Sequence, residues 1–132
     1  MIVFADAFFF VALLNRRDEY HQIVKEYALA FEGSMMTTQW ILTEVADALA
    51  AASSRQAIKP LVTELQASRS IVTVAASPGL FQRGLDLYHE RPDKHWSLTD
   101  CISFVVMADH GLSEALTGDR HFAQAGFHPI FK

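Results

Sequence analysis

The N-terminal segment is the feature that most constrains how this chain can fold. Between residues 2 and 14, Asp6 is the only residue that is not apolar. The segment is shorter than the roughly 20 residues of a membrane-spanning helix, and no basic residue precedes it as in a signal peptide. We therefore expect it to be buried in the core of a cytoplasmic protein that has no membrane association.

Size and composition indicate one globular domain that spans residues 1–132. Hydrophobic residues make up 51% of the chain, which is enough to build a core. The formal charge of −4 disfavours a protein that coats nucleic acid through general basicity. A single cysteine, Cys101, excludes an intrachain disulfide and a thiolate zinc site.

Short strand-like runs alternate with helical segments along the chain. We predict strands at residues 1–5, 35–37, 71–75, 115–117 and 129–131, and helices at residues 7–14, 18–31, 39–53, 60–68, 78–90 and 97–110. Asp18 is expected to cap the second helix, and Pro60 to begin the fourth. This alternation predicts an α/β protein with a mostly parallel sheet and helices on both faces. Ligands of such proteins bind beyond the carboxyl ends of the strands.

Two acidic residues follow predicted strands and are therefore expected at that edge of the sheet. Asp6 comes directly after the strand "IVFA", and Asp119 comes shortly after "ALT". Taken alone, each of these residues is better explained as a cap of the turn or helix that follows it.

Glu44 is predicted to point toward the interior of the protein. At about 100° per residue, it lies within the apolar stripe of its helix, whereas Asp47 lies just outside that stripe. A buried carboxylate costs several kcal/mol unless it is paired or binds a cation. Glu44 therefore either forms a salt bridge with a buried Lys or Arg or takes part in a functional site.

Asp100 also lies at the start of a helix that is expected to be buried. The helix "SLTDCISFVVMA" is apolar on nearly all sides, and Asp100 is on the same side as Phe104 and Met107. The spacing of Ser97 and Asp100 fits a capping box, in which the carboxylate accepts a hydrogen bond from the Ser97 amide. A functional role and a capping role are equally compatible with this pattern, and one carboxylate can serve both.

The four acids can all meet at one end of the predicted sheet. Four clustered carboxylates repel one another, and a hard divalent cation such as Mg²⁺ or Mn²⁺ relieves that repulsion. The chemistry that this arrangement suits best is metal-assisted hydrolysis of a phosphodiester. The candidate catalytic and metal-binding residues are Asp6, Glu44, Asp100 and Asp119.

At these residues the sequence resembles the PIN-domain ribonucleases, and among them the VapC-type toxins of toxin–antitoxin pairs. The resemblance extends along essentially the whole chain. It is carried by Asp6 after the first strand, by Glu44 in "TEVADAL", by Asp100 in "SLTDCISFVVM" and by the ending "ALTGDRHFAQAGF" around Asp119. The chain departs from the family pattern at two positions, Ala7 and Gly118. The first departure removes a hydroxyl that supports the site in many relatives, and the second places a small residue in the last turn of the site.

The resemblance implies a three-layer α/β/α fold and a Mg²⁺- or Mn²⁺-dependent endoribonuclease that cleaves RNA. It also implies a homodimer and a cognate antitoxin that blocks the site. By the same resemblance, Asp6, Glu44, Asp100 and Asp119 take the acidic roles of the family. The alternative is a catalytically silent module of this fold that binds or regulates, and the presence of all four acids argues against it.

Several basic and aromatic residues are candidates for holding RNA beside an acidic centre. They are Arg16, Arg17, Arg91, Lys94, His95, Trp96, Arg120 and His121. Arg16 and Arg17 also fit an ordinary solvated helix end, and Trp96 either stacks on a base or packs in the core or a dimer interface. For His121 a structural hydrogen bond is preferred over metal ligation, because an oxygen-rich site does not need imidazole.

Three consecutive phenylalanines, Phe8, Phe9 and Phe10, are too many for one narrow stripe of a helix. This surface, or the helix that carries Leu61 and Leu65, either forms a groove for a second copy or an antitoxin, or is enclosed by the fold itself.

Overall fold

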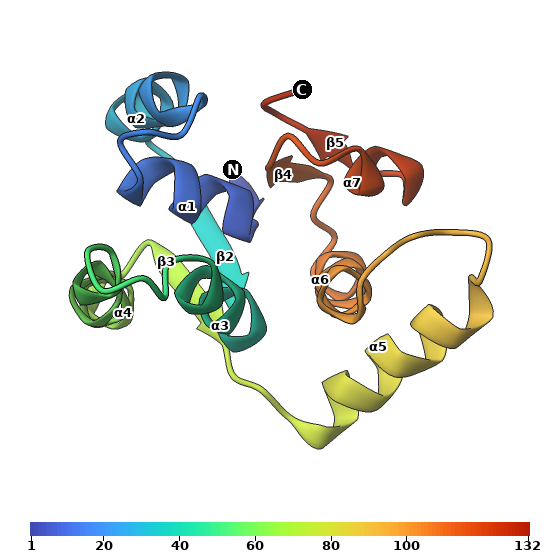
Figure 1. Cartoon of the computed structure of the whole chain (residues 1–132). Helices are drawn as coiled ribbons and strands as arrows, with labels where there is room; N and C mark the ends of the chain where they lie inside the picture. The colour runs from blue at the N-terminus through green and yellow to red at the C-terminus, as the bar shows by residue number, and fades with distance from the viewer.

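Five strands form one sheet in the order β3-β2-β1-β4-β5, and every neighbouring pair is parallel (Figure 1). The computed structural model describes residues 1–132. The strands are β1 (Ile2–Ala5), β2 (Ser34–Thr38), β3 (Ile71–Val74), β4 (Glu114–Leu116) and β5 (His128–Pro129). The helices are α1 (Ala7–Leu14), α2 (His21–Ala30), α3 (Gln39–Ala48), α4 (Ile58–Ala67), α5 (Pro78–Glu90), α6 (Leu98–Asp109) and α7 (Arg120–Gln124), with a 3₁₀ turn at Arg55–Ala57.

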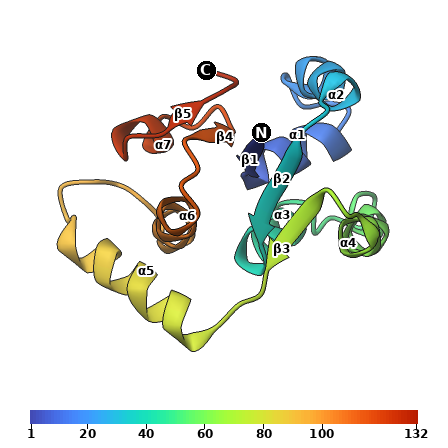
Figure 2. The same cartoon turned by 180° about the vertical axis from the view of Figure 1, so that it is seen from behind.

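The helices cover the two faces of the sheet and complete an α/β/α sandwich. Helices α1 to α4 connect β1, β2 and β3, which follow one another toward one edge of the sheet. After β3 the chain returns to β4 on the other side of β1, so the right-handed crossover places α5 and α6 on the opposite face. Figures 1 and 2 show these two groups of helices on either side of the strands. The predicted three-layer fold is confirmed.

The apolar N-terminal segment lies inside this sandwich. Phe9 and Phe10 of α1 are 2% and 1% exposed, and Phe8 packs against the rings of Tyr20 and Phe131. Complete burial of each such side chain contributes about 1.5–3 kcal/mol to stability. Leu61 and Leu65 of α4 are buried as well. The fold therefore encloses these residues, and they do not form an open groove. No helix is long and apolar enough to cross a lipid bilayer.

Several element ends differ from the prediction. Helix α2 begins at His21, because the Asp18 carboxylate accepts a hydrogen bond from the Tyr20 amide and closes a turn before the helix instead of capping it. Helix α3 ends at Ala48, although residues 49–52 are favourable helix formers. The Ser54 hydroxyl donates to the carbonyl groups of Leu49 and Ala51 just beyond the helix end.

The prediction also differs from the structure for two further helices. Helix α4 begins at Ile58, so that Pro60 lies within the first turn and not at the first position. The short helix α7 was not predicted, because five residues carry too little periodicity to be recognised.

Gly84 sets the distance between α5 and α6. A methyl group at this position would clash with the Ile102 side chain and approach its Cα to 3.2 Å. We expect Gly84→Ala to destabilise the protein by about 1–3 kcal/mol, because one methyl group too many must fit between packed helices. Urea denaturation measures this change.

Gly79, in the first turn of the same helix, provides the matched control. A Cβ there meets no atom within 4 Å, so Gly79→Ala should leave stability unchanged or raise it by up to about 1 kcal/mol. Equal effects of the two substitutions would contradict this packing argument.

Candidate metal centre

Asp6 and Asp119 lie next to each other at the carboxyl edge of the sheet. They follow β1 and β4, which pair directly, with Ala5 opposite Leu116. The buried Thr117 hydroxyl joins them: it donates to Asp6 Oδ2 at 2.8 Å and accepts from the Asp119 amide at 3.1 Å. Both acids are at the N-cap positions of helices, but only Asp119 forms a capping hydrogen bond with its side chain.

Asp100 reaches the same region from the first turn of α6. Its Oδ2 accepts from the Ser97 amide at 3.1 Å, and its own amide donates to the Ser97 hydroxyl at 3.0 Å, so the capping box is present. The same oxygen lies 3.1 Å from His121 Nδ1, which must carry the proton because a carboxylate only accepts. Asp100 Oδ1 has no donor within the protein. One carboxylate thus caps the helix and still offers a free oxygen.

Glu44 faces the other acids from α3 and has no basic partner. Burial raises its pKa most, and the charges of Asp100, Asp119 and Asp47 raise it further. The sequence left a salt bridge with a buried Lys or Arg open, and this alternative is wrong, because Glu44 forms no ion pair. Its side chain is half-buried rather than fully inside the core.

Repulsion and burial dominate the electrostatics of this edge. The pKa of Asp6 rises from 3.8 to about 7, mainly through burial, and its bond to Thr117 opposes the rise only in part. Burial also raises the pKa of Asp100. None of the four carboxylates pairs with Lys or Arg. The only basic side chain in contact with them is His121, whose Nδ1 lies 3.1 Å from Asp100 and 3.5 Å from Asp119, so no Lys or Arg neutralises this anionic centre.

The donor atoms present fit a hard divalent cation. One ligand atom each from Asp100, Asp119 and His121 lie within 4.8 Å of one another. Thr117 connects Asp6 to this group, and Glu44 is coupled to it through charge. Mg²⁺ and Mn²⁺ prefer such carboxylate oxygens, and a cation there would offset the cost of burying them. His121 is the least suited of these donors, since its Nδ1 already donates to Asp100.

The structure gives a reason for each departure from the family pattern. A Cβ at Gly118 would lie 2.8 Å from the ring of Phe8, so the glycine makes room for this ring at the site. Ala7 lacks a hydroxyl, and the one that supports Asp6 comes from Thr117 instead. The sequence analysis did not identify Thr117 as a residue that supports the acids. The one signal for this role was its position in the C-terminal motif, two residues before Asp119.

Thr117→Val is expected to lower stability by about 1–3 kcal/mol. The substitution keeps the shape of a fully buried side chain but leaves the Asp119 amide without its acceptor and Asp6 without its donor. Urea denaturation at pH 8 measures the loss. Thr117→Ser retains the hydroxyl and should cost clearly less, and a loss in Thr117→Ser as large as in Thr117→Val would contradict a dominant role of the hydroxyl.

A parallel α/β sandwich with clustered carboxylates at the carboxyl edge of its sheet is a class of protein suited to binding a divalent cation. The family model of the PIN domain matches residues 3–128, and the chain belongs to the PIN domain family. No curated protein matches the sequence.

Solved structures share the fold. VapC20 of Mycobacterium tuberculosis, a toxin that cleaves the sarcin-ricin loop, superposes with a TM-score of 0.88 at 24% sequence identity, over 98% of each chain. FitAcB from Neisseria gonorrhoeae has a TM-score of 0.60 at 16% identity, over 100% of this chain and 97% of the other.

Proposed function

We propose that this protein is a metal-dependent endoribonuclease that hydrolyses phosphodiester bonds of RNA. The observation that carries the proposal is the group of four carboxylates at one sheet edge, none of which has a Lys or Arg partner. Membership in the PIN domain family and the fold shared with an RNA-cleaving toxin support it. The absence of neutralising side chains is what a catalytically active centre requires, because the cation must bind there.

Asp6, Asp100 and Asp119 would hold one Mg²⁺ or Mn²⁺ directly or through water, and Glu44 would hold a second ion or orient the attacking water. A bound ion supplies two effects: it lowers the pKa of water and offsets charge that develops on the phosphoryl oxygens. Glu44 is half-buried and has a raised pKa, which suits a group that accepts a proton from water. Thr117 and His121 hold Asp6 and Asp100 in place through their hydrogen bonds.

We further propose that the protein is the toxin of a toxin–antitoxin pair. Its structural neighbour VapC20 is a toxin that cleaves the sarcin-ricin loop, and it shares the fold over nearly the whole chain. The proposed partners are RNA as substrate, an antitoxin that blocks the site, and a second copy of the chain in a homodimer.

An RNA cleavage assay with Mg²⁺ or Mn²⁺, and with EDTA, tests the nuclease. We expect cleavage with either metal, none in EDTA, and a large loss of rate in Glu44→Gln. Glu64→Gln, at an exposed position of α4, is the matched control and should cleave at the parent rate. A catalytically silent module, the competing function, would leave RNA intact under every condition.

A further inference from the structure

Two adjoining clefts extend from the acidic centre along residues 91–97, the loop between α5 and α6. The smaller has a volume of about 230 Å³ and no hydrophobic lining; its walls are Asp93, Lys94, His95, Arg120, His121 and Gln124. It begins at the acidic centre, because the His121 side chain in its wall contacts Asp100. The larger cleft, of about 760 Å³, shares Lys94 and His95 with it. This volume is in the range of sites that enclose small organic molecules.

The Lys and Arg side chains that line the two clefts differ in whether they already have an acidic partner. Arg91 donates to both carboxylate oxygens of Asp93 and lies 5.2 Å from the centre of the Trp96 ring. Its charge is therefore already paired, and its side chain is held by contacts within the loop. Lys94 has only this same Asp93, at 3.9 Å. Arg120 is exposed and forms no ion pair. Lys94 and Arg120, which both line the smaller cleft, are therefore available to an anion.

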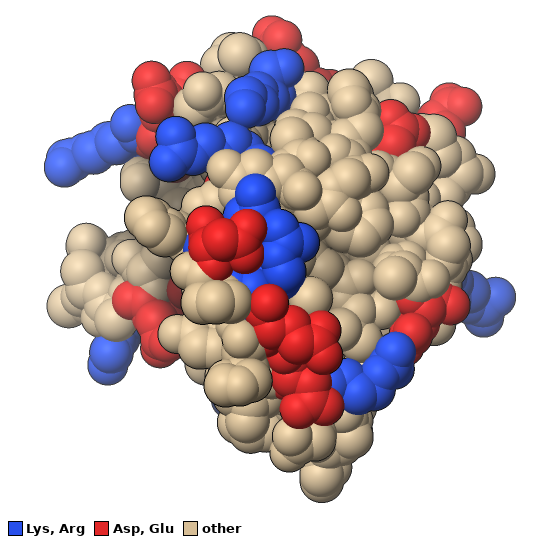
Figure 3. Space-filling view, turned by 90° about the vertical axis from the view of Figure 1, so that its right-hand side faces the viewer, with Lys and Arg blue, Asp and Glu red and all other residues tan.

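The surface around them is of mixed charge. Figure 3, which faces the side formed by α5, α6 and α7, shows Lys and Arg side chains next to Asp and Glu side chains, without a continuous basic area. A polyanion thus gains favourable contacts at few points on this side, and the smaller cleft is one of them.

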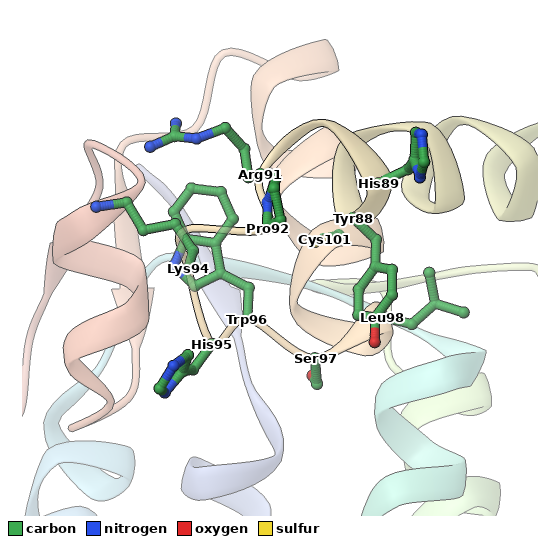
Figure 4. A pocket seen from close by; sticks show the side chains of 10 residues that line it. All are labelled: Tyr88, His89, Arg91, Pro92, Lys94, His95, Trp96, Ser97, Leu98 and Cys101. Atoms are coloured by element: carbon green, nitrogen blue, oxygen red, sulfur yellow. The ribbon is translucent and has the colours of Figure 1, made fainter.

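The larger cleft offers an aromatic side chain to a base. Tyr88 is 50% exposed, and its ring extends beside Leu98 over the cleft (Figure 4). Trp96, the residue that the sequence suggested for base stacking, is not available. It is 7% exposed, packs edge-on against Phe104, and donates its indole N–H to Gln124.

We propose that these clefts bind the RNA strand on one side of the bond that is cut. Lys94 and Arg120 contact a backbone phosphate next to the acidic centre, and Tyr88 stacks on a base in the larger cleft. A base can reach Tyr88 only when it is unpaired, so the bound strand must be single-stranded where it lies in the larger cleft. This inference rests on the proposed nuclease function, because it assigns the reacting phosphodiester to the acidic centre.

Binding of a fluorescein-labelled single-stranded RNA of about 12 nucleotides, followed by fluorescence anisotropy with Mn²⁺, tests the phosphate contacts. All proteins carry Glu44→Gln to prevent cleavage. Adding Lys94→Ala and Arg120→Ala should weaken binding at least about tenfold and reduce the slope of log K against log salt by about 1.4, or about 0.7 per lost contact. Lys25→Ala with Arg69→Ala is the control, since it removes the same two charges from exposed positions, in α2 and before β3, that line neither cleft.

An equal loss in both double variants, or an unchanged slope, would overturn the phosphate subsite. Tyr88→Leu should weaken binding about tenfold without changing the slope, and Tyr88→Phe should bind as the parent does. If Tyr88→Leu binds normally, the base contact is wrong, and the exposed ring serves another partner.

Cleavage measurements in proteins that keep Glu44 separate this inference from the proposed function. If RNA is cut and the Lys94 and Arg120 substitutions leave KM unchanged, the subsite is wrong and the nuclease remains. If the binding differences are found but no metal supports cleavage, the nuclease is wrong and the RNA-binding clefts remain.

Discussion

Asp6→Asn is expected to abolish RNA cleavage and, in the absence of metal, to stabilise the protein at neutral and alkaline pH. Asp6 is 6% exposed, its only side-chain hydrogen-bond donor is Thr117, and its charge faces those of Glu44 and Asp100. Asparagine keeps the shape and the oxygen that accepts from Thr117, but it removes the charge that would bind a cation. We expect the cleavage rate to fall by at least about a hundredfold, the scale for removing a group on which charge stabilisation depends.

The gain in stability follows from the raised pKa. Between the ordinary value of 3.8 and the folded value of about 7, folded Asp6 keeps a proton that the unfolded chain has lost. The contribution of Asp6 is therefore fully present below about pH 4 and is lost as pH rises through about 7. The complete shift corresponds to on the order of 4 kcal/mol. Asp6→Asn should remove this dependence and raise the free energy of unfolding at pH 8 by on the order of 2–4 kcal/mol.

Urea denaturation in EDTA at several pH values, together with RNA cleavage assays, measures both effects. Asp86→Asn, at an exposed position of α5, is the control and should change neither cleavage nor the pH dependence. Cleavage by Asp6→Asn at the parent rate would remove Asp6 from the site. If Asp6→Asn is less stable than the parent at pH 8, the ionised Asp6 carboxylate does not lower the free energy of unfolding.

Mn²⁺ should stabilise the protein against thermal unfolding, and the effect should disappear in EDTA. A cation that binds only the folded chain adds about 2.7 kcal/mol when its concentration is 100 times its dissociation constant. Asp100→Asn and Asp119→Asn each remove one of the grouped ligand atoms and should lose most of this stabilisation. Mn²⁺ affinity should also rise between about pH 6 and pH 8, because the cation competes with the proton on Asp6.

Thermal denaturation of the parent, the two variants and Asp86→Asn, with and without Mn²⁺, measures this prediction. Asp86→Asn should be stabilised as much as the parent. A parent protein that is not stabilised by Mn²⁺ or Mg²⁺ would contradict the metal centre and favour a silent module. Stabilisation that survives in both Asp100→Asn and Asp119→Asn would place the cation elsewhere.

The architecture could be predicted because it depends on local patterns. Apolar β-branched runs such as "IVTV" alternate with helical segments, and this alternation specifies a parallel sheet covered on both faces. Apart from the short helix α7, which was missed, the errors lay at the ends of elements such as α2 and α3, where a single side-chain hydrogen bond decides which residue begins or ends the helix.

The sequence by itself determined which carboxylates are candidates. Asp6 and Asp119 follow strands, and the helical repeat turns Glu44 inward; each of these facts is a matter of a few neighbouring residues. The sequence could also place Asp100 at a helix start, but it could not decide between a cap and a site. In the structure, Asp100 Oδ2 accepts the capping hydrogen bond from the Ser97 amide and also contacts Nδ1 of His121, which belongs to another helix.

Only the tertiary structure decided how these residues are supported and where the basic residues lie. Thr117 joins Asp6 to Asp119 across two strands, and Gly118 admits the Phe8 ring. Arg16 and Arg17 lie at the end of α1 away from the acids, whereas Arg120 adjoins them. Such arrangements depend on contacts between residues far apart in the chain, which periodicity and spacing do not encode, whereas strands, helices and the acids at their ends follow from neighbouring residues.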